Sequence, residues 1–328
     1  MGKLMPGTIA HDRLPGLIGK VFISGGTGFL GRAILRRAEK EHWDCQITAM
    51  SRDEEKLWKA KDRFGKLVNC VLGDVRDQHN LNIAMRGHET VIHAAAIKFI
   101  PEAEANVFET VKTNVDGSRN VMRAAVRAGV ERVVAISTDK AALPANTYGM
   151  TKALMERMFA EANAWGNTRF VAVRYGNVVG STGSIIPIFK HQREKYGRVK
   201  VTDENMTRFW LSADEAIDLI LLALAKAEEL PGRIFVPRCG AMYIKDLAQL
   251  LADGVPIDVI GIRPGEKLHE DLVNYQESPR VDLLADYFVI HPAMHAAEGG
   301  SWTYRSSSPA VWITLKEMSA MIKDAEDI

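Results

Sequence analysis

A stretch near the middle of the chain places four acid–base side chains close together. Asp139 and Lys140 follow Ser137 and Thr138, and Tyr148 and Lys152 come soon after. A Tyr-x-x-x-Lys spacing puts both side chains on one face of a helix. We expect the Lys152 cation to lower the pKa of the Tyr148 phenol from about 10, which would make it a usable base. Such a base suits removal of a hydroxyl proton while hydride leaves the same carbon.

Asp139 and Lys140 add a second acid–base pair, which simple alcohol oxidation does not need. Two proton-handling pairs indicate two chemical steps. The alternative interpretation of this pair is a surface ion pair beside a strand end. The Tyr-x-x-x-Lys spacing is weak evidence alone, because any helix can carry it by chance, so its weight depends on the residues upstream.

A glycine-rich turn follows the first apolar run of the chain. Residues 20–24 predict a short buried strand, and a helix with Leu30, Ile34 and Ala38 on one stripe comes after the turn. The glycines allow a tight turn, close approach of a pyrophosphate and close helix–strand packing. The helix N-terminus offers free N–H groups to phosphates. We predict a dinucleotide site, with a turn that binds nothing as the alternative, and its residues here are Gly25, Thr27, Gly28, Phe29, Leu30 and Gly31.

The strand expected over 46–50 runs into Ser51, Arg52 and Asp53. An acidic residue at this position typically binds the ribose 2′-hydroxyl of NAD. Here a hydroxyl and a guanidinium come first, and both suit a 2′-phosphate, with Lys56 assisting. We therefore predict NADP. In the alternative, Arg52 is a solvated loop charge and Asp53 binds the ribose.

Strands and helices continue to alternate, with further strands expected over 67–72, 90–93, 132–136 and 170–174. The fold class predicted is α/β, a Rossmann-like doubly wound parallel sheet, whose ligands bind at the carboxyl ends of the strands. His93 is expected to be structural, Asp74 to be a cofactor ligand or a turn residue, and Lys98 to bind phosphate or sugar or to be solvated. The cofactor-binding candidates at these strand ends are Asp74, Val75, Ala94, Ala95, Ala96 and Lys98.

The composition gives no indication of a nucleic-acid-binding, metal-binding or membrane protein. The chain has 328 residues and a net charge of +1, which gives no sign of a nucleic-acid or membrane surface. Cys45, Cys70 and Cys239 lack metal-ligand spacing and are expected to be reduced thiols, with no metal bound. The apolar run at 219–225 is far shorter than a membrane span of roughly 20 residues. We expect a cytoplasmic protein whose residues 1–18 form a leader that is not a signal peptide.

Motifs along nearly the whole chain match one known group of enzymes. They lie at 25–28, 51–54, 93–98, 112–114, 137–141, 148–152, 173–181, 206–210 and 260–270. With these motifs the chain resembles the extended short-chain dehydrogenases/reductases that act on nucleotide sugars. More narrowly, it resembles the inverting UDP-N-acetylglucosamine 4,6-dehydratases of bacterial polysaccharide and flagellin-glycan synthesis.

The resemblance implies a role for each acid–base residue. Tyr148, paired with Lys152, would take the C4 hydroxyl proton as hydride passes to NADP, and Thr138 would hydrogen-bond the same oxygen. Lys140 would then remove the C5 proton, and Asp139 would protonate the departing C6 hydroxyl. NADPH would return hydride to C6, and a proton would reach C5 from the opposite face. A lysine base must be partly neutral, so we expect burial or nearby cations to lower its pKa by several units.

The same resemblance implies the rest of the site. Asn114 joins the cofactor-binding set, and Arg263 and Glu266 would bind the diphosphate and the ribose of the UDP-sugar. Asn177, Arg208 and Lys98 are further substrate-binding candidates. Equally good interpretations make Asn177 a turn amide and Arg208 part of an interdomain ion pair.

We expect an NADP-binding domain at 19–177, onto which a helix at 213–228 packs, and a smaller UDP-sugar-binding domain at 178–210 and 238–328. The resemblance suggests a homo-oligomer, with a hexamer as the candidate form. The alternative activity is a C4- or C5-epimerase, which needs no Asp139–Lys140 pair. A non-catalytic NADP-sensing protein is the alternative of another class, and such sensors usually lack the Tyr or the Lys found here.

Overall fold

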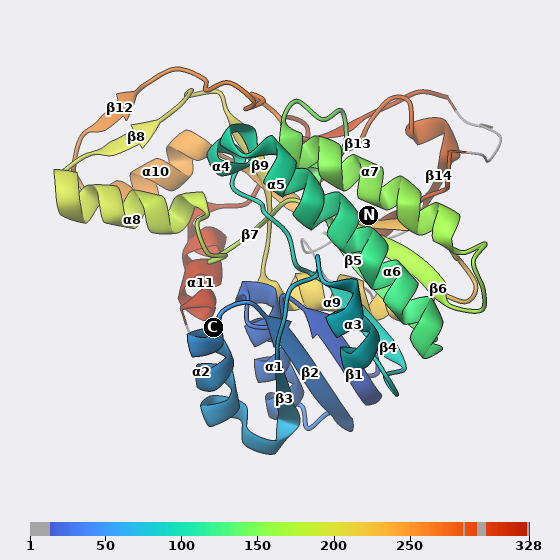
Figure 1. Cartoon of the computed structure of the whole chain (residues 1–328). Helices are drawn as coiled ribbons and strands as arrows, with labels where there is room; N and C mark the ends of the chain where they lie inside the picture. Colours follow the sequence, from blue (N-terminus) through green and yellow to red (C-terminus); the bar gives the residue numbers. More distant parts are fainter. Residues whose placement is uncertain (1–13, 285, 294–299, 327) are drawn as a thin grey trace.

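The computed structural model describes residues 14–284, 286–293, 300–326 and 328, so most of the expected leader at 1–18 lies outside the described residues. The described residues form two units (Figure 1). The larger unit surrounds a nine-stranded sheet, and the smaller one is built from three short sheets and several helices. The predicted α/β fold is confirmed.

Seven parallel strands make up most of the central sheet. In spatial order they are β3 (Val68–Leu72), β2 (Cys45–Ser51), β1 (Gly19–Ser24), β4 (Thr90–His93), β5 (Arg132–Thr138), β6 (Arg169–Tyr175) and β10 (Ile234–Pro237). The strand order reverses between β1 and β4, which is where ligands of doubly wound sheets bind. All six strands expected before residue 177 are present.

Two antiparallel strands, β15 (Tyr287–Ile290) and β14 (Val281–Leu283), extend the sheet beyond β10. The prediction placed these residues in the smaller domain, and their pairing with the central sheet corrects it. Phe288, Val289 and Ile290 are buried against the main core. A return strand of this kind covers the otherwise open edge of β10.

Helices cover both faces of the sheet, and each face has its own apolar core. One face carries α1 (Phe29–Lys40), α2 (Glu54–Phe64) and α9 (Ala213–Ala225), and the other carries α3 (Gln78–Ala84), α6 (Gly117–Ala128) and α7 (Thr147–Ala162). Helix α9 begins with a capping box between Ser212 and Glu215, and it contacts β5, β6 and β10. The helix expected at 213–228 therefore packs on the larger unit as predicted.

Two short helices, α4 (Ile100–Ala105) and α5 (Val107–Val111), lead into a π-helical turn at Lys112–Asp116 just before α6. Such turns are often found at functional sites. Here the turn directs Asn114 inward. The Asn114 amide accepts from the Ile97 N–H at 2.8 Å and donates to the Ile97 carbonyl at 2.9 Å and to the Thr151 hydroxyl at 3.0 Å. This fixes the loop after β4 against α7.

The smaller unit has a third core around Phe189, Trp210, Met242, Leu247 and Met318. Its strands are β7 (Asn177–Val178), β8 (Val199–Val201), β9 (Thr207–Leu211), β11 (Gly240–Tyr243), β12 (Ile257–Val259), β13 (Asp271–Val273) and β16 (Tyr304–Arg305), and its helices are α8 (Ile185–Tyr196), α10 (Ile244–Ala252) and α11 (Leu315–Ala325).

No helix in the described part of the chain combines the length and apolar character needed to cross a membrane.

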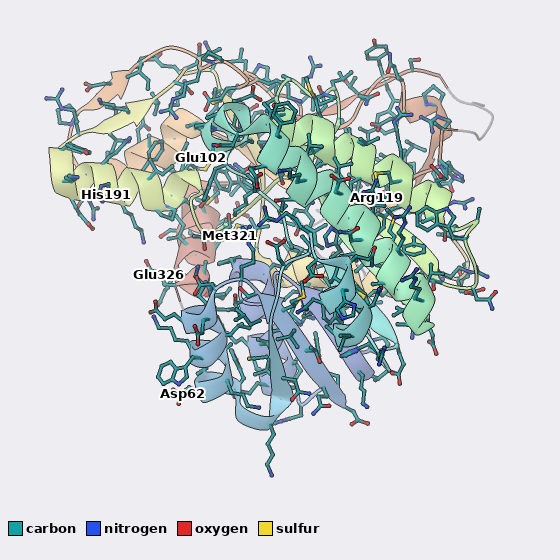
Figure 2. All side chains as sticks on the ribbon, viewed as in Figure 1. Asp62, Glu102, Arg119, His191, Met321 and Glu326 are labelled. Carbon is teal, nitrogen blue, oxygen red and sulfur yellow. The ribbon has the colours of Figure 1, made fainter. Side chains whose placement is uncertain are left out.

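Helix α11 links the two units (Figure 2). Met321 packs against the core of the smaller unit, and Glu326 pairs with Lys190 of α8 at 2.6 Å. At the end of the chain, the Ile328 carbonyl accepts from Arg32 of α1 at 3.2 Å. The two units are thus tied together beside the edge of the sheet at which the strands end.

A buried ion network connects β6, α7 and the segment after β13. The Arg174 guanidinium, 1% exposed, pairs with Glu156 at 2.6 Å and with Glu277 at 2.7 Å. It also donates to the Leu272 carbonyl at 3.0 Å, and Ser137 donates to Glu156 at 2.6 Å. These bonds satisfy groups that would be costly to bury alone.

Replacing Arg174 by Met should lower the free energy of unfolding by about 3–5 kcal/mol, because the buried Glu156 and the largely covered Glu277 would lose their cation. Urea unfolding at neutral pH measures this loss. The control is Arg169→Met, whose partner Glu228 is exposed, and which should cost no more than about 1 kcal/mol. An equal decrease in the free energy of unfolding in the two variants would contradict the stabilising contribution proposed for the buried network.

Candidate active site

A cavity of about 1510 Å³ lies at the carboxyl ends of the parallel strands and extends between the two units. The larger unit lines it with the ends of β1, β2, β4, β5 and β6, and the smaller unit with residues of β9 and the loops around it. Of the predicted site residues, all but Gly31, Asn114 and Asp139 line this cavity.

The three exceptions lie directly behind the cavity wall. Gly31 packs against the glycine turn, and Asn114 holds the loop after β4 through the bonds given above. Asp139 is fully buried and bonded to Thr138 and Lys140. The structure therefore gives Asn114 a supporting place rather than a place in the cavity wall, because its amide is occupied by protein groups.

The glycine turn is shaped for close approach of a phosphate group. Gly25 has φ +72°, and a Cβ added there would lie 2.9 Å from the Ala95 nitrogen. Gly28 precedes α1, and no side chain caps the helix there. The N–H groups of the first turn thus face the cavity, where the helix dipole favours an anion.

The residues predicted to bind a 2′-phosphate line the part of the cavity next to the end of β2. Arg52 and Lys56 both line it, and the Arg52 side chain is 56% exposed, 3.6 Å from Asp74. Asp53 caps α2 by accepting from the Lys56 N–H at 3.0 Å, and it pairs with the Lys56 amine at 2.7 Å. Because the Asp53 carboxylate is already bonded, it is poorly placed to bind a ribose hydroxyl.

The end of β5 presents a compact hydrogen-bonded array. Thr138 donates to Asp139 Oδ1 at 2.9 Å, and the Lys140 amine donates to the same oxygen at 3.0 Å. The Asp139 side chain is 0% exposed and that of Lys140 is 15% exposed, so this is not a surface ion pair. Asp139 Oδ2 is buried and has no hydrogen-bond partner in the part of the chain that the structure describes.

Tyr148 also lines the cavity, but its ionisation differs from the expectation. Burial raises the pKa of the Tyr148 phenol to about 12, and the lowering effects come from Lys140 and a hydrogen bond with Thr138. The Lys152 amine instead donates to the Ile136 carbonyl at 2.7 Å. Burial lowers the pKa of Lys152 to about 8, partly offset by Glu156. The prediction that Lys152 lowers the pKa of Tyr148 was wrong, because its amine is directed at the backbone.

The expected fall in the pKa of Lys140 is also contradicted. Burial lowers this pKa, but the negative charges of Asp139 and Glu270 outweigh burial and raise it above its ordinary value. Glu270 Oε1 lies 3.5 Å from the Lys140 amine. Lys140 is therefore an ammonium group at neutral pH in this arrangement.

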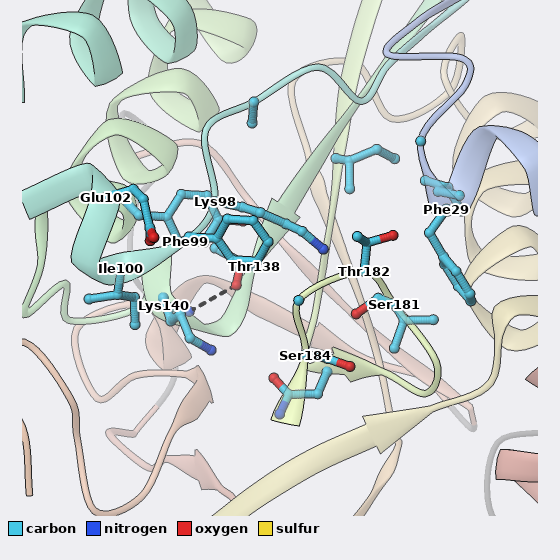
Figure 3. Close-up of a pocket in the computed structure, with 18 of the residues that line it drawn as sticks. Phe29, Lys98, Phe99, Ile100, Glu102, Thr138, Lys140, Ser181, Thr182 and Ser184 are labelled. Atoms are coloured by element: carbon cyan, nitrogen blue, oxygen red, sulfur yellow. Dashed lines mark hydrogen bonds between the residues drawn. The ribbon is translucent and has the colours of Figure 1, made fainter. Parts of the chain in front are cut away.

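The opposite wall carries the substrate-binding candidates. Figure 3 shows Lys98 and Phe99 across the cavity from Ser181 and Thr182, with Lys140 nearby. Burial and the Lys140 charge lower the pKa of Lys98. Asn177, Arg263 and Glu266 also line the cavity, in keeping with a polar ligand there.

Arg208 lines the cavity too, but its hydrogen bonds go to backbone carbonyls. It donates to Thr207 at 2.7 Å, Lys267 at 2.9 Å and Leu268 at 3.1 Å. These bonds hold the loop that carries Arg263 and Glu266. Arg208 therefore positions this loop, whichever ligand it also contacts.

Sequence reasoning missed two carboxylates. Glu156 accepts a hydrogen bond from Ser137 at the end of β5 and lies four residues after Lys152 on α7, a spacing that was visible in the sequence. Glu270 faces Lys140 from a distant part of the chain, and only its place at the end of the 260–270 motif pointed to it. His93 is structural as expected, since both ring nitrogens are bonded, to Ser24 at 2.7 Å and Ser118 at 2.9 Å.

Replacing Gly31 by Ala should destabilise the protein by about 1–3 kcal/mol and weaken dinucleotide binding. The reason is that its Cβ would lie 2.1 Å from the Gly26 carbonyl oxygen, which forces the phosphate-binding turn to move. Thermal unfolding and dinucleotide titration measure both effects. Gly166→Ala is the matched control, because the nearest atom to its Cβ is 3.7 Å away. Normal binding by the Gly31 variant would contradict the role given to this contact.

The chain is similar to known proteins over most of its length. The family described as polysaccharide biosynthesis protein matches residues 21–292. The chain is 36% identical to the UDP-N-acetylglucosamine 4,6-dehydratase (inverting) of Campylobacter jejuni subsp. jejuni serotype O:23/36 (strain 81-176), over 93% of this chain and 98% of the relative. It is 38% identical to the UDP-glucose 4-epimerase of Rickettsia massiliae (strain Mtu5), over 82% of each.

Among solved structures, Pen from Bacillus thuringiensis superposes with a TM-score of 0.87 at 31% identity, covering 95% of this chain and 99% of that one. The resemblance drawn from the motifs is thus confirmed over nearly the full length of the sequence. The chain belongs to the polysaccharide biosynthesis protein family.

Proposed function

We propose that this chain is a UDP-N-acetylglucosamine 4,6-dehydratase that inverts C5 and works with NADP. The observation that carries the proposal is the buried Thr138–Asp139–Lys140 array, which shares one cavity wall with Tyr148. A relative of that activity, 36% identical over 93% of this chain, supports it. The product would be a UDP-4-keto-6-deoxy-N-acetylhexosamine.

The residues present fit a nicotinamide dinucleotide. The glycine turn and the uncapped start of α1 would hold the pyrophosphate, and Ser51, Arg52 and Lys56 the 2′-phosphate. When bound, the nicotinamide accepts and returns a hydride. Arg52 and Asp53 both line the cavity, and NADP is favoured over NAD because the Asp53 carboxylate is already bonded to Lys56 at the start of α2.

The first role of the chain is to remove the proton from the C4 hydroxyl. Tyr148 is the base and Thr138 a hydrogen-bond partner of the same oxygen, since both line the cavity side by side. The raised pKa of Tyr148 means that the phenol needs added positive charge nearby to ionise, and Lys140 supplies part of it.

The second role is elimination of water across C5 and C6. The Lys140 ammonium passes one proton to Asp139, which leaves a neutral amine and a carboxylic acid on adjacent residues. The amine takes the C5 proton, and the acid gives its proton to the departing C6 hydroxyl, which leaves as water. Both groups then return to their initial charges, so the pair needs no outside base despite the raised pKa of Lys140.

The epimerase alternative has one observation in its favour, the 38% identical Rickettsia massiliae relative. A 4-epimerase has no use for a buried carboxylate–amine pair beside Tyr148, and burying such a pair is costly. We therefore place the dehydratase first. The homo-oligomer, the hexamer as its candidate form and the cytoplasmic location stay predictions.

Incubating the protein with UDP-N-acetylglucosamine in heavy water should give a C6 methyl group and deuterium at C5, seen by NMR, without consumption of added NADPH. Lys140→Ala should abolish water loss, because the C5 proton then has no base, yet leave NADP binding intact. The control is Lys59→Ala, which removes an exposed amine paired with Glu55 and should retain full activity. Formation of UDP-N-acetylgalactosamine alone would instead establish an epimerase.

Arg52→Ala should weaken NADP binding by about 10- to 100-fold, because a charge-assisted bond to phosphate contributes about 1.5–3 kcal/mol. NAD binding should stay nearly unchanged, since NAD lacks that phosphate. Fluorescence titration with both dinucleotides measures the difference. Arg63→Ala, which removes an exposed guanidinium paired with Glu39 outside the cavity wall, is the control. An equal loss for NAD and NADP would argue against 2′-phosphate recognition.

A further inference from the structure

Glu270 is a buried carboxylate that takes no part in the proton transfers of Tyr148, Asp139 and Lys140. Its side chain is 2% exposed, yet it lines the cavity beside Lys140. Its backbone is fixed on both sides, because the Glu270 N–H donates to Ser306 Oγ at 2.9 Å and the Ser306 N–H donates to the Glu270 carbonyl at 2.9 Å. The smaller unit thus holds this carboxylate rigidly against the end of β5.

The Lys140 amine lies between two carboxylates that come from different parts of the chain. The distance from the Lys140 amine to Asp139 Oδ1, at the end of β5, is 3.0 Å. The distance from the same amine to Glu270 Oε1, in the segment just before β13, is 3.5 Å. A lysine side chain has a flexible four-carbon stem and gains a defined position only through such contacts. Two contacts from different directions locate the amine at the cavity wall.

The surrounding charges keep Glu270 ionised. Lys267 lies 2.8 Å from Glu270 Oε2, and Lys267 is itself held by donating to the Ala142 carbonyl at 3.0 Å. Burial raises the pKa of Glu270, but Lys140, Arg208 and Lys267 together lower it below its ordinary value. Charged and polar groups from several elements face Glu270, Lys140 and Lys267. From the larger unit they are Thr138 of β5, Asp139 of the turn after β5, Lys98 of the loop after β4 and Tyr148 of α7, and from the smaller unit Arg208 of β9.

We propose that Glu270 is a positioning residue for Lys140, which holds the amine at the cavity wall and supplies the negative charge against which the amine takes up a proton. The inference rests on the proposed dehydratase function. A proton on the carbon next to a ketone is only weakly acidic, so its removal needs a strong base in the right place. An anion beside the amine stabilises the positive charge that develops on Lys140 as it takes up the C5 proton.

The test removes the charge of Glu270 and keeps its shape, in Glu270→Gln. In protein labelled with carbon-13 at the lysine ε-carbons, the Lys140 signal, assigned by its loss in Lys140→Arg, should titrate about 1–3 pH units lower than in the unchanged protein. The rate of C5 deuterium incorporation should fall about 3- to 30-fold in kcat with KM nearly unchanged, since the amine loses the charged contact that holds it at the cavity wall and substrate binding is not altered.

Glu270→Asp keeps the charge and should recover the Lys140 titration and part of the rate. Glu228→Gln removes a surface carboxylate by the same chemical change and should leave both readouts unaltered. An unchanged Lys140 titration in Glu270→Gln would overturn the inference. If that titration shifts while the unchanged protein forms no 4-keto-6-deoxy product, the proposed function fails and the coupling between Glu270 and Lys140 stands.

Discussion

The position of the smaller unit against the larger one depends on the buried contact between the Lys140 ammonium and the Asp139 carboxylate. Neither charge can be removed from water alone without a cost of several kcal/mol, so each needs partners with close geometry. Asp139 receives them from its own strand end, through Thr138 and Lys140. Lys140 needs Glu270 as well, and Glu270 is delivered by the smaller unit. The charged cluster at the end of β5 is therefore complete only when both units are folded against each other.

The same logic explains the supporting network one layer deeper. Glu156 accepts from Ser137 and pairs with Arg174, which donates to the Leu272 carbonyl in β13 and pairs with Glu277 after it. Two buried ion networks thus connect the strand ends of the larger unit to one short segment of the smaller unit, residues 270–277. Small displacements of that segment would leave charges without partners, so the networks fix the relative position of the units. This rigidity suits a reaction in which several groups must meet one sugar ring.

The ionisation of the site also follows from the three-dimensional arrangement. Tyr148 and Lys140 both have raised pKa values, the first because of burial and the second because two carboxylates outweigh burial. A pair of adjacent groups that exchange one proton internally can supply acid and base together without either being free in solution. Lys152, whose pKa is lowered to about 8, is bonded to the Ile136 carbonyl and so supports the end of β5.

The sequence by itself determined the local features. Apolar runs and glycine spacing placed the parallel strands and the phosphate-binding turn, because these depend on neighbours along the chain. The site residues at strand ends followed, since parallel strands end at one edge. Only the tertiary structure decided that β14 and β15 join the central sheet, that Lys152 points at the backbone, and that Glu270 faces Lys140. These depend on contacts between residues far apart in sequence, and a pKa depends on the charges and burial that such contacts create.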